Sequence, residues 1–277
     1  MPAPQALVQH PPPCPVAAAR VHNALTIELL FVCAVSNVDV LKRRLLTSPC
    51  LQPGQRPLAL RWNARSAADA LNPILESTAS ALWVVWVHQD VVLPQGWDAR
   101  FLDSARQFEK GYSSSNADFV RRDPVGVLGV YGVRGHGSAA QRVGRVLDRG
   151  RWLDETATLP GEVDSLDELL LALPGDTDLR LDPALGFDLY GTDIVLQAQT
   201  RGQTAWVVDA PCEHWSDTPR AGRMPASLIE RVAASGDAFE RKWAARLPLK
   251  TPCFNIDRPG DVRRFAASLS APAARQP

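Results

Sequence analysis

The stretch Thr26–Val35 (TIELLFVCAV) decides the fold class of this chain. It is a short, continuous apolar run rich in branched side chains, and Ser36-Asn37 follows it directly. This pattern is typical of a strand that is buried on both faces of a sheet. A second run of the same kind, Ala81–Val87 (ALWVVWV), lies further along the chain. We therefore expect both runs to be strands of a parallel sheet.

The segments around these two strands alternate between helix and strand patterns. Asp39–Leu46 has helical spacing, Pro57–Trp62 alternates like a strand, and Ser66–Thr78 places its apolar residues on one helical face. Such alternation indicates an α/β fold with a mainly parallel central sheet flanked by helices. The first 110 residues therefore predict a nucleotide-binding architecture.

The rest of the chain gives further elements and the domain limits. We expect residues 1–24 to be a disordered Pro/Ala-rich lead, 25–250 a single domain, and 251–277 a C-terminal tail that is loosely ordered from about Pro259. Glu162–Leu173 reads as a strand or a short helix. The other expected elements are a helix from Trp97, an apolar strand Val125–Val133, a hairpin at Arg145–Trp152, a helix from an N-cap at Thr192 to Gly202, and a strand Thr204–Val208.

Composition excludes several classes of protein. The 277 residues carry 30 Lys+Arg and 30 Asp+Glu, so the net charge is zero and no nucleic-acid partner is expected. The five cysteines form no C-x-x-C pair, which argues against a zinc module or a disulfide framework. The apolar runs are shorter than the roughly 20 residues of a membrane span, and no secretory signal is apparent. We expect a cytoplasmic protein, with peripheral membrane contact left open.

The polar triplet His88-Gln89-Asp90 stands where the second apolar strand ends. In open parallel sheets, ligands bind beyond the carboxyl ends of the strands, so a carboxylate there is placed to hold a divalent ion. The alternative is that His88 and Asp90 only end the strand and cap the next turn. His214, which follows a later strand, is likewise either a ligand or a structural residue.

Asp193 lies in the first turn of the helix expected from Thr192. The helix dipole stabilises an anion at this position, which is reason enough for an Asp to be there. The same placement keeps the carboxylate ionised, as a general base requires.

Several short motifs follow one another in a recognisable order. They are HQDV after the apolar strand, Gly96-Trp97, GVLGVYG, VDSLDELLL, FDLYGTDIVLQA, a strand ending in Glu213-His214, and FERKW, with Ala70-Leu71-Asn72 before them. Together they span about Thr26 to Trp243. In this order they resemble the glycosyltransferase-like branch of glycosyltransferase family two.

The resemblance implies a GT-A fold and assigns roles to specific residues. His88-Gln89-Asp90 takes the place of the family's D-x-D motif, which holds Mg²⁺ or Mn²⁺ on the diphosphate of a nucleotide-sugar. Asp90 is then the metal ligand, and His88 contacts the nucleotide. Asp193 retains the second acid of the family's E-D motif, which makes it the catalytic base. His214 matches a metal or diphosphate contact.

Other residues receive weaker assignments, each beside an ordinary structural alternative. Ser36 and Asn37 are candidates for facing the base or ribose of the nucleotide, and Lys242 for closing over the diphosphate. Asp167, Trp97 and Trp215 are candidates for the acceptor site, the two tryptophans because aromatic faces stack on sugar rings.

These assignments predict a glycosyltransferase that moves a sugar from a nucleotide-sugar donor to a hydroxyl of a glycan or another acceptor, with Mn²⁺ or Mg²⁺ and with inversion. The alternative is a catalytically inactive GT-A-fold module that binds a glycan or a nucleotide. A nucleotidyltransferase is less favoured because CAVSNVDVLKRR lacks the glycine-rich loop expected after the first strand.

Overall fold

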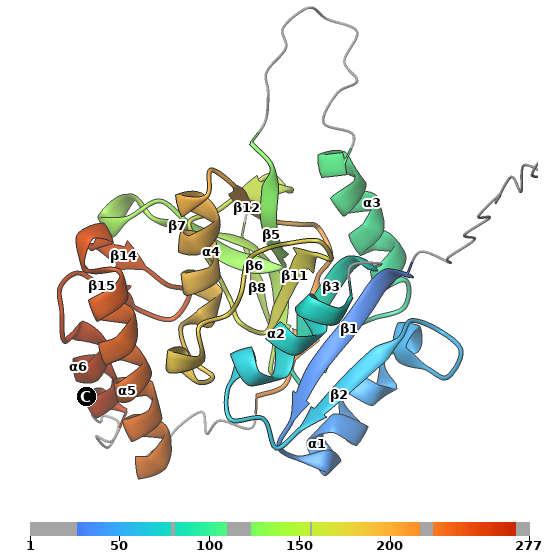
Figure 1. Cartoon of the computed structure of the whole chain (residues 1–277), viewed down its shortest axis with the longest axis horizontal. Coiled ribbons are helices and arrows are strands. Elements are labelled where there is room, and N and C mark those ends of the chain that lie inside the picture. Colours follow the sequence, from blue (N-terminus) through green and yellow to red (C-terminus); the bar gives the residue numbers. More distant parts are fainter. Residues whose placement is uncertain (1–26, 79–80, 110–122, 156, 217–223, 270–277) are drawn as a thin grey trace, which may run out of the picture.

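The computed structural model describes residues 27–78, 81–109, 123–155, 157–216 and 224–269 (Figure 1). Within these ranges the fold is mixed α/β, with a seven-stranded sheet in the order β2-β1-β3-β11-β5-β12-β9. The predicted lead, residues 1–24, lies outside the described residues. The strands of this sheet are β1 (Ile27–Val35), β2 (Leu58–Trp62), β3 (Ala81–Val87), β5 (Val125–Gly129), β9 (Gly161–Glu162), β11 (Leu170–Pro174) and β12 (Thr204–Val207).

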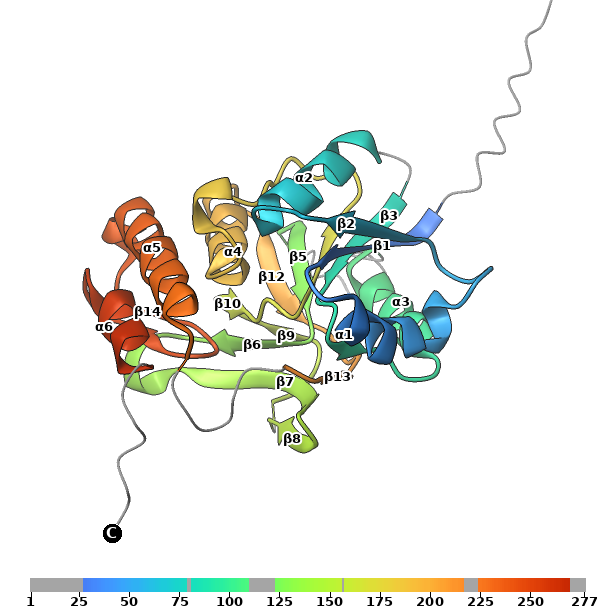
Figure 2. The same cartoon turned by 90° about the horizontal axis from the view of Figure 1, so that it is seen from below.

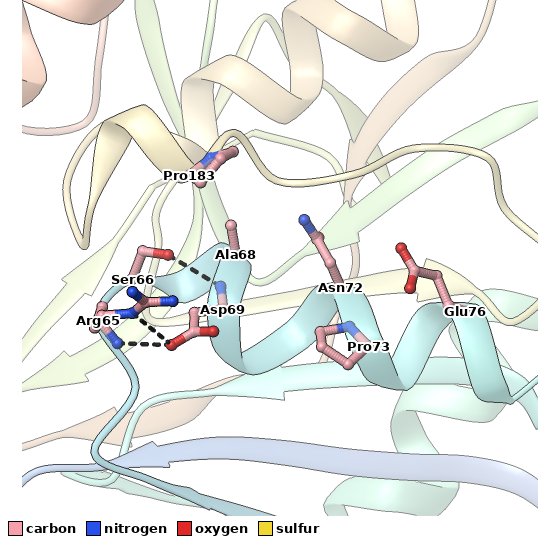
Figure 3. Close-up of a pocket in the computed structure, with 8 residues that line it drawn as sticks. All are labelled: Arg65, Ser66, Ala68, Asp69, Asn72, Pro73, Glu76 and Pro183. Atoms are coloured by element: carbon pink, nitrogen blue, oxygen red, sulfur yellow. Dashed lines mark hydrogen bonds and ion pairs between the residues drawn. The ribbon is translucent and has the colours of Figure 1, made fainter.

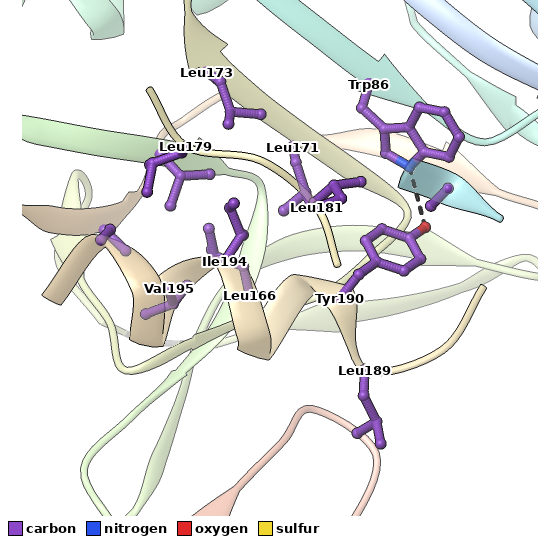
Figure 4. Close-up of a cluster of buried hydrophobic side chains, with 14 of the residues drawn as sticks. Trp86, Leu166, Leu171, Leu173, Leu179, Leu181, Leu189, Tyr190, Ile194 and Val195 are labelled. Atoms are coloured by element: carbon purple, nitrogen blue, oxygen red, sulfur yellow. Dashed lines mark hydrogen bonds between the residues drawn. The ribbon is translucent and has the colours of Figure 1, made fainter. Parts of the chain in front are cut away.

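Strands β1 and β3 are buried on both faces, as their sequences predict. Phe31 and Val85 enter one apolar core, whereas Val32 and Trp86 enter the core on the opposite face. Successive side chains of a strand point to opposite faces, so an unbroken apolar run serves both cores at once. Figure 4 shows part of the second core, where Leu171 and Leu173 face helix α4.

Helices cover both faces of the sheet. Leu41 of α1 and Phe101 of α3 belong to one core, whereas Leu71 of α2 and Ile194 of α4 belong to the other. The helices are α1 (Val38–Arg43), α2 (Ala67–Ser77), α3 (Trp97–Glu109), α4 (Tyr190–Thr200), α5 (Ala226–Lys242) and α6 (Asp261–Ser268). Short 3₁₀ turns are Leu45–Thr47, Pro49–Leu51, Gly137–Ala139, Pro183–Leu185 and Ala244–Arg246. Among the described residues, none of these helices combines the length and the apolar character needed to cross a bilayer.

The sheet is mixed, so the expectation of a mainly parallel sheet is wrong. Strands β2, β1 and β3 are parallel, but β11 runs antiparallel to both β3 and β5, and β9 antiparallel to β12. Strand β11 (LLALP) is an apolar run between covered faces, like β1. Burial on both faces produces such a run whatever the strand direction, so the sequence pattern does not distinguish the two cases.

A smaller second sheet lies beside the first and has the order β10-β6-β7-β13-β4, with β8 paired to β7. Its strands are β4 (Val91–Val92), β6 (Tyr131–Arg134), β7 (Gln141–Asp148), β8 (Arg151–Asp154), β10 (Ser165–Leu166) and β13 (Cys212–His214). The single strand predicted at Val125–Val133 therefore divides at Val130, and its two halves join different sheets. The hairpin predicted at Arg145–Trp152 is confirmed by the β7–β8 pairing.

Two predicted boundaries are wrong. Helix α4 begins at Tyr190, after Leu189, so Thr192 is not its N-cap; Thr192 instead hydrogen-bonds Ser165 through their hydroxyls at 2.8 Å. The expected tail contains the strand β15 (Asn255–Ile256), which pairs with β14 (Leu249–Lys250), and the helix α6. Helices α5 and α6 lie together at the end of the molecule away from α1 and α3 (Figure 2).

Gly236 of α5 permits the close approach of α6. A Cβ at this position would overlap the Cβ and Cγ1 atoms of Val262. We expect Gly236→Ala to lower the free energy of unfolding by roughly 1–3 kcal/mol through overpacking, measured by urea denaturation. The double variant Gly236→Ala/Val262→Gly removes both overlapping atoms, so it is expected to lose less stability than the two single changes added together. Additive losses would contradict a tight α5–α6 contact.

Candidate functional site

Strand pairing brings His88, Asp90 and His214 together. His88 and Asp90 lie in the turn that follows β3, and His214 is the last residue of β13. Strand β13 pairs antiparallel with β4, which places His214 opposite Val91 and next to Asp90. One ligand atom from each of the three residues lies within 4.8 Å of the others. The three residues, called the triad below, fit the donor set of a metal site, as the sequence predicts for Asp90 and His214.

The Oδ1 atom of Asp90 is the most informative atom of the triad. It lies 4.0 Å from Nδ1 of His88 and 3.7 Å from Nε2 of His214. This oxygen is buried, and no described residue forms a hydrogen bond with it. A buried carboxylate oxygen without a donor is costly, whereas a cation between it and the two imidazoles would satisfy it.

Asp148 fixes the tautomer of His214. Strand β7 pairs parallel with β13 and places Asp148 directly opposite His214. Oδ1 of Asp148 accepts a hydrogen bond from Nδ1 of His214 at 3.0 Å, and Arg149 Nε donates to its Oδ2 at 3.1 Å. With the proton on Nδ1, the lone pair of His214 is on Nε2, the atom that faces Asp90.

Tyr190 fixes the tautomer of His88. Its hydroxyl accepts a hydrogen bond from Trp86 Nε1 at 3.0 Å (Figure 4) and donates to the Glu168 carbonyl oxygen at 3.1 Å. We assign the single hydroxyl proton to that carbonyl, which can only accept; Nε2 of His88, 2.6 Å away, then donates to the hydroxyl. The lone pair of His88 is then on Nδ1, which faces Asp90.

The pKa shifts agree with these assignments. Burial lowers the pKa of His88 below its usual value, and the negative charge of Asp90 offsets this only in part. The ring is therefore kept neutral, which is the form that binds metal. Burial also raises the pKa of Tyr190 well above its usual value, so the hydroxyl keeps its proton.

We expect Tyr190→Phe to weaken divalent metal binding by about 10- to 100-fold, as the loss of groups that orient a ligand does elsewhere. The change removes the acceptor for Nε2 of His88, so the ring loses its preference for the Nδ1 lone pair. Isothermal titration with Mn²⁺ measures the effect. Tyr131→Phe is the matched control because Tyr131 donates to Glu155, outside the triad. Unchanged affinity in Tyr190→Phe would contradict the assigned tautomer.

Asp193 does not join the triad, and its predicted role as catalytic base is wrong. Its side chain is fully buried. Oδ1 accepts from Trp243 Nε1 and is paired with Lys242 Nζ, both at 2.7 Å, and Oδ2 accepts from Gln197 Nε2 at 2.7 Å. With both oxygens occupied by donors from α4 and α5, this carboxylate joins the two helices.

Two further assignments are also corrected. Lys242 is held by Asp193 and Asp182, the latter at 2.8 Å, so it is not placed over a diphosphate. Trp97 is 1% exposed, stacks on Phe101 and donates Nε1 to the carbonyl of Ala210, so its face is not open to a sugar.

Ser36 and Asn37 lie at the carboxyl end of β1 and are tied to the turn that carries the triad. Their backbone N–H groups both donate to Oε1 of Gln89 at 3.0 Å, and Gln89 Nε2 donates to the Ser36 hydroxyl at 2.8 Å. The Asn37 side chain caps α1 by accepting from the N–H groups of Asp39 and Val40. Ser36 therefore remains exposed beside this turn, whereas the Asn37 side chain is already used.

The structure brings Trp215 beside the triad. Its backbone N–H donates to the carbonyl of Asp90 at 2.9 Å. Its ring is covered by the guanidinium of Arg44, 4.2 Å from the ring centroid, and Nε1 donates to Glu213. Trp215 is therefore near the site, with one ring face already occupied by Arg44.

Asp167 lines a cavity of about 190 Å³ together with Glu168 and Asp188. A larger, open cavity of about 450 Å³ lies along α2 (Figure 3), and none of the triad lines it. In that cavity Asp69 is paired with Arg65, and Asn72 is bonded to the backbone of Leu181.

Sequence reasoning missed Asp148, Tyr190 and Glu168. Asp148 ends a hairpin strand, where an Asp before a turn is unremarkable, and no signal in the sequence distinguishes it. Tyr190 and Glu168 lie within quoted motifs, but their roles depend on contacts between α4 and the β10–β11 segment.

Comparison with known proteins gives no family for the chain. No protein-family model matches it, and no curated protein matches it. Among solved structures, the crystal structure of A197 from STIV is similar over 69% of this chain and 86% of that chain, with 14% sequence identity and a TM-score of 0.39. A similarity this slight carries no argument about function.

Proposed function

We propose that the protein is a metal-dependent glycosyltransferase that uses a nucleotide-sugar donor and an acceptor hydroxyl. The observation that carries the proposal is the buried Oδ1 of Asp90, which has no hydrogen-bond partner among the described residues and lies 4.0 Å from Nδ1 of His88 and 3.7 Å from Nε2 of His214. The motif order described above supports a GT-A-like arrangement. The site lies at the end of β3, in an α/β sheet where ligands commonly bind beyond the carboxyl ends of strands.

The donor set favours Mn²⁺ over Mg²⁺. Mg²⁺ prefers oxygen ligands and keeps several waters, whereas imidazole nitrogens suit first-row transition metals. Two imidazoles and one carboxylate therefore suit Mn²⁺ better, and they leave coordination positions for phosphate oxygens.

The turn after β3 also links the metal site to the end of β1. Gln89 stands between the two metal-site residues His88 and Asp90, and it holds the N–H groups of Ser36 and Asn37. A nucleotide lying across the ends of β1 and β3 would meet Ser36 at one side and the triad at the other.

The residues of the triad would hold a divalent ion and fix its position. When bound, a divalent ion supplies Lewis-acid stabilisation of the negative charge that develops on the leaving diphosphate. Asp148 and Tyr190 keep both histidine lone pairs directed toward Asp90. Because its buried oxygens are already hydrogen-bonded, Asp193 is not available as the proton acceptor. Inversion at the sugar therefore needs a different proton acceptor.

The test is Mn²⁺-dependent cleavage of nucleotide-sugars. UDP-glucose, UDP-N-acetylglucosamine and GDP-mannose are incubated with the protein and Mn²⁺, Mg²⁺ or EDTA, and the released nucleoside diphosphate is measured. We expect release with Mn²⁺, less with Mg²⁺ and none with EDTA. His214→Ala is expected to lose this release, whereas His136→Ala keeps it because His136 precedes the 3₁₀ turn Gly137–Ala139, outside the triad. Binding of Mn²⁺ and UDP without any cleavage would instead identify an inactive binding module.

A further inference from the structure

The cavity of about 190 Å³ lies between the β10–β11 segment, the start of α4 and the β14–β15 hairpin. Three carboxylates line it, those of Asp167, Glu168 and Asp188, and none of its described lining residues is a Lys, an Arg or a His. Most of the remaining lining is apolar and includes Phe254 and Phe265. The cavity therefore combines a negatively charged part with an apolar, aromatic part.

Two of the three carboxylates have no cationic partner. Asp188 is neutralised by Arg231, which donates two hydrogen bonds of 2.9 and 3.1 Å to it. Among the described residues, no Lys or Arg lies within ion-pair distance of Asp167 or Glu168. The guanidinium of Arg142 on β7 instead donates to the carbonyl oxygen of residue 252 at 3.1 Å. The cavity thus keeps a negative charge that no side chain compensates.

Backbone groups, and not a counter-charge, hold Glu168 in place. Its carboxylate accepts hydrogen bonds from the N–H groups of Leu189 and Gly191 at the start of α4. A Cβ at residue 191 would overlap a backbone carbonyl oxygen of β10 and would lie 3.0 Å from Cγ of Glu168, so the glycine lets the Glu168 segment lie against this turn. Burial, and then the negative charges of Asp188 and Asp167, raise the pKa of Glu168 well above its usual value. A cation beside this carboxylate would stabilise its charged form.

The aromatic part of the wall consists of Phe254, in the β14–β15 hairpin, and Phe265 of α6. Their rings stack with centroids 4.2 Å apart and an interplanar angle of 24°. The face of an aromatic ring attracts a cation, and proteins bind ammonium ligands with aromatic side chains for this reason. Carboxylates and aromatic rings in one small cavity therefore suit a ligand with a cationic group and an apolar body.

The carboxylates of the cavity are not arranged to share a metal ion. Among the described residues, only the triad forms a group of three His, Cys, Asp or Glu side chains whose ligand atoms lie within 4.8 Å of one another. A neutral ligand would leave the charges of Asp167 and Glu168 uncompensated, which is costly in a partly buried site. An organic cation meets both conditions because its charge is carried by a body of several atoms.

The size and position of the cavity limit the ligand further. Its volume is below the roughly 300 Å³ at which pockets for drug-sized ligands begin, so the ligand is small. The carbonyl oxygen of Glu168 accepts from the Tyr190 hydroxyl at 3.1 Å, and that hydroxyl lies 2.6 Å from Nε2 of His88. This segment separates the cavity from the triad, so a ligand in the cavity does not contact a metal ion at the triad.

We propose that this cavity is a binding site for a small organic cation, an ammonium group on a short apolar body. The ammonium group pairs with the carboxylates of Asp167 and Glu168. The carbon atoms bonded to its nitrogen carry part of the positive charge, and they pack against the phenyl rings. The site takes no part in the glycosyl transfer proposed above, so the inference goes beyond the proposed function and does not depend on it.

Choline and n-butylammonium are the probes, because each has a neutral counterpart of similar shape, namely 3,3-dimethyl-1-butanol and 1-butanol. Binding to the wild-type protein is measured by isothermal titration in EDTA and again with Mn²⁺. We expect at least one of the two cations to bind at least tenfold more tightly than its neutral counterpart. Because the triad lies outside the cavity, we expect Mn²⁺ to change the affinity for the cation by less than threefold.

Three variants locate the bound cation. Glu168→Gln and Asp167→Asn each remove one negative charge while keeping the size of the side chain, and each is expected to weaken binding by about tenfold or more. Phe265→Leu removes an aromatic ring and is expected to weaken binding by roughly 2- to 30-fold. Glu162→Gln is the matched control, because its side chain is exposed on β9 and outside the cavity. Thermal unfolding in EDTA checks that each variant is folded, and the comparison of the two probes with their neutral counterparts needs no variant.

The outcomes test this site separately from the metal site. Binding of neither cation, or equal binding of each cation and its neutral counterpart, would overturn the proposal. Wild-type affinity in both Glu168→Gln and Asp167→Asn would also overturn it, because the cation would then bind elsewhere. A wild-type protein that binds the cation but neither binds Mn²⁺ nor cleaves a nucleotide-sugar would contradict the proposed function alone.

Discussion

Asp90→Asn is expected to abolish the stabilisation of the protein by Mn²⁺, while the metal-free fold stays as stable as before or becomes more stable. In the metal-free protein, Oδ1 of Asp90 is a buried charged oxygen with no hydrogen-bond partner among the described residues. An amide carries no charge, and its N–H groups can donate to the free lone pairs of His88 and His214. We expect a gain of about 0–1 kcal/mol in EDTA, together with a loss of roughly 100-fold or more in Mn²⁺ affinity.

Thermal unfolding with and without Mn²⁺ measures both effects at once. Wild-type protein at a metal concentration 100 times the Kd is stabilised by about 2.7 kcal/mol, and this gain should vanish in the variant. Asp103→Asn is the control because its side chain is 73% exposed and lies on α3. A variant that is strongly destabilised in EDTA would show that Asp90 stabilises the fold. The main argument for a metal site would then fail.

Asp193→Asn is expected to destabilise the fold by about 3 kcal/mol, the cost of breaking a buried charged network. The three side-chain partners of Asp193, namely Gln197, Lys242 and Trp243, all donate to it. A carboxylate accepts from all three, but an amide has one acceptor oxygen, and its N–H₂ group would face another donor. The loss of charge also leaves Lys242 with Asp182 as its remaining ion-pair partner among the described residues.

Urea denaturation measures this change, with Asp178→Asn as the control because Asp178 forms an ion pair with Arg201 at the surface. We expect no measurable change in the control. A variant of Asp193 with wild-type stability and no transfer activity would restore the catalytic role that the sequence suggests and would contradict the structural one.

The cause of the error over Asp193 is general. An Asp in the first turn of a helix is stabilised by the helix dipole whether it faces solvent, a substrate or another helix. Which of these it faces depends on what packs against that turn, and here the end of α5 supplies Trp243 and Lys242. The two residues follow Asp193 by about fifty positions, and nothing in their local sequence indicates the contact.

Strand pairing in the second sheet brings together the residues of the candidate metal site. Asp90 and His214 meet because β4 pairs with β13, and Asp148 joins them because β7 pairs with β13 on its other edge. Strand β4 has two residues and β13 three, which is too short for a periodic pattern. The sequence therefore contains the ligands without showing that they are neighbours.

The sequence alone determined the two-sided burial of β1 and β3, the helices α2 and α3, the β7–β8 hairpin, and the polar triplet at the end of β3. These features depend on local periodicity and on the apolar run itself, which a single segment displays in full. Tertiary structure decided the direction of β11, the division of Val125–Val133 between two sheets, the histidine tautomers, and the burial of Asp193. Each of these depends on hydrogen bonds or packing between segments far apart in the chain, and the free energy of such contacts is absent from any local pattern.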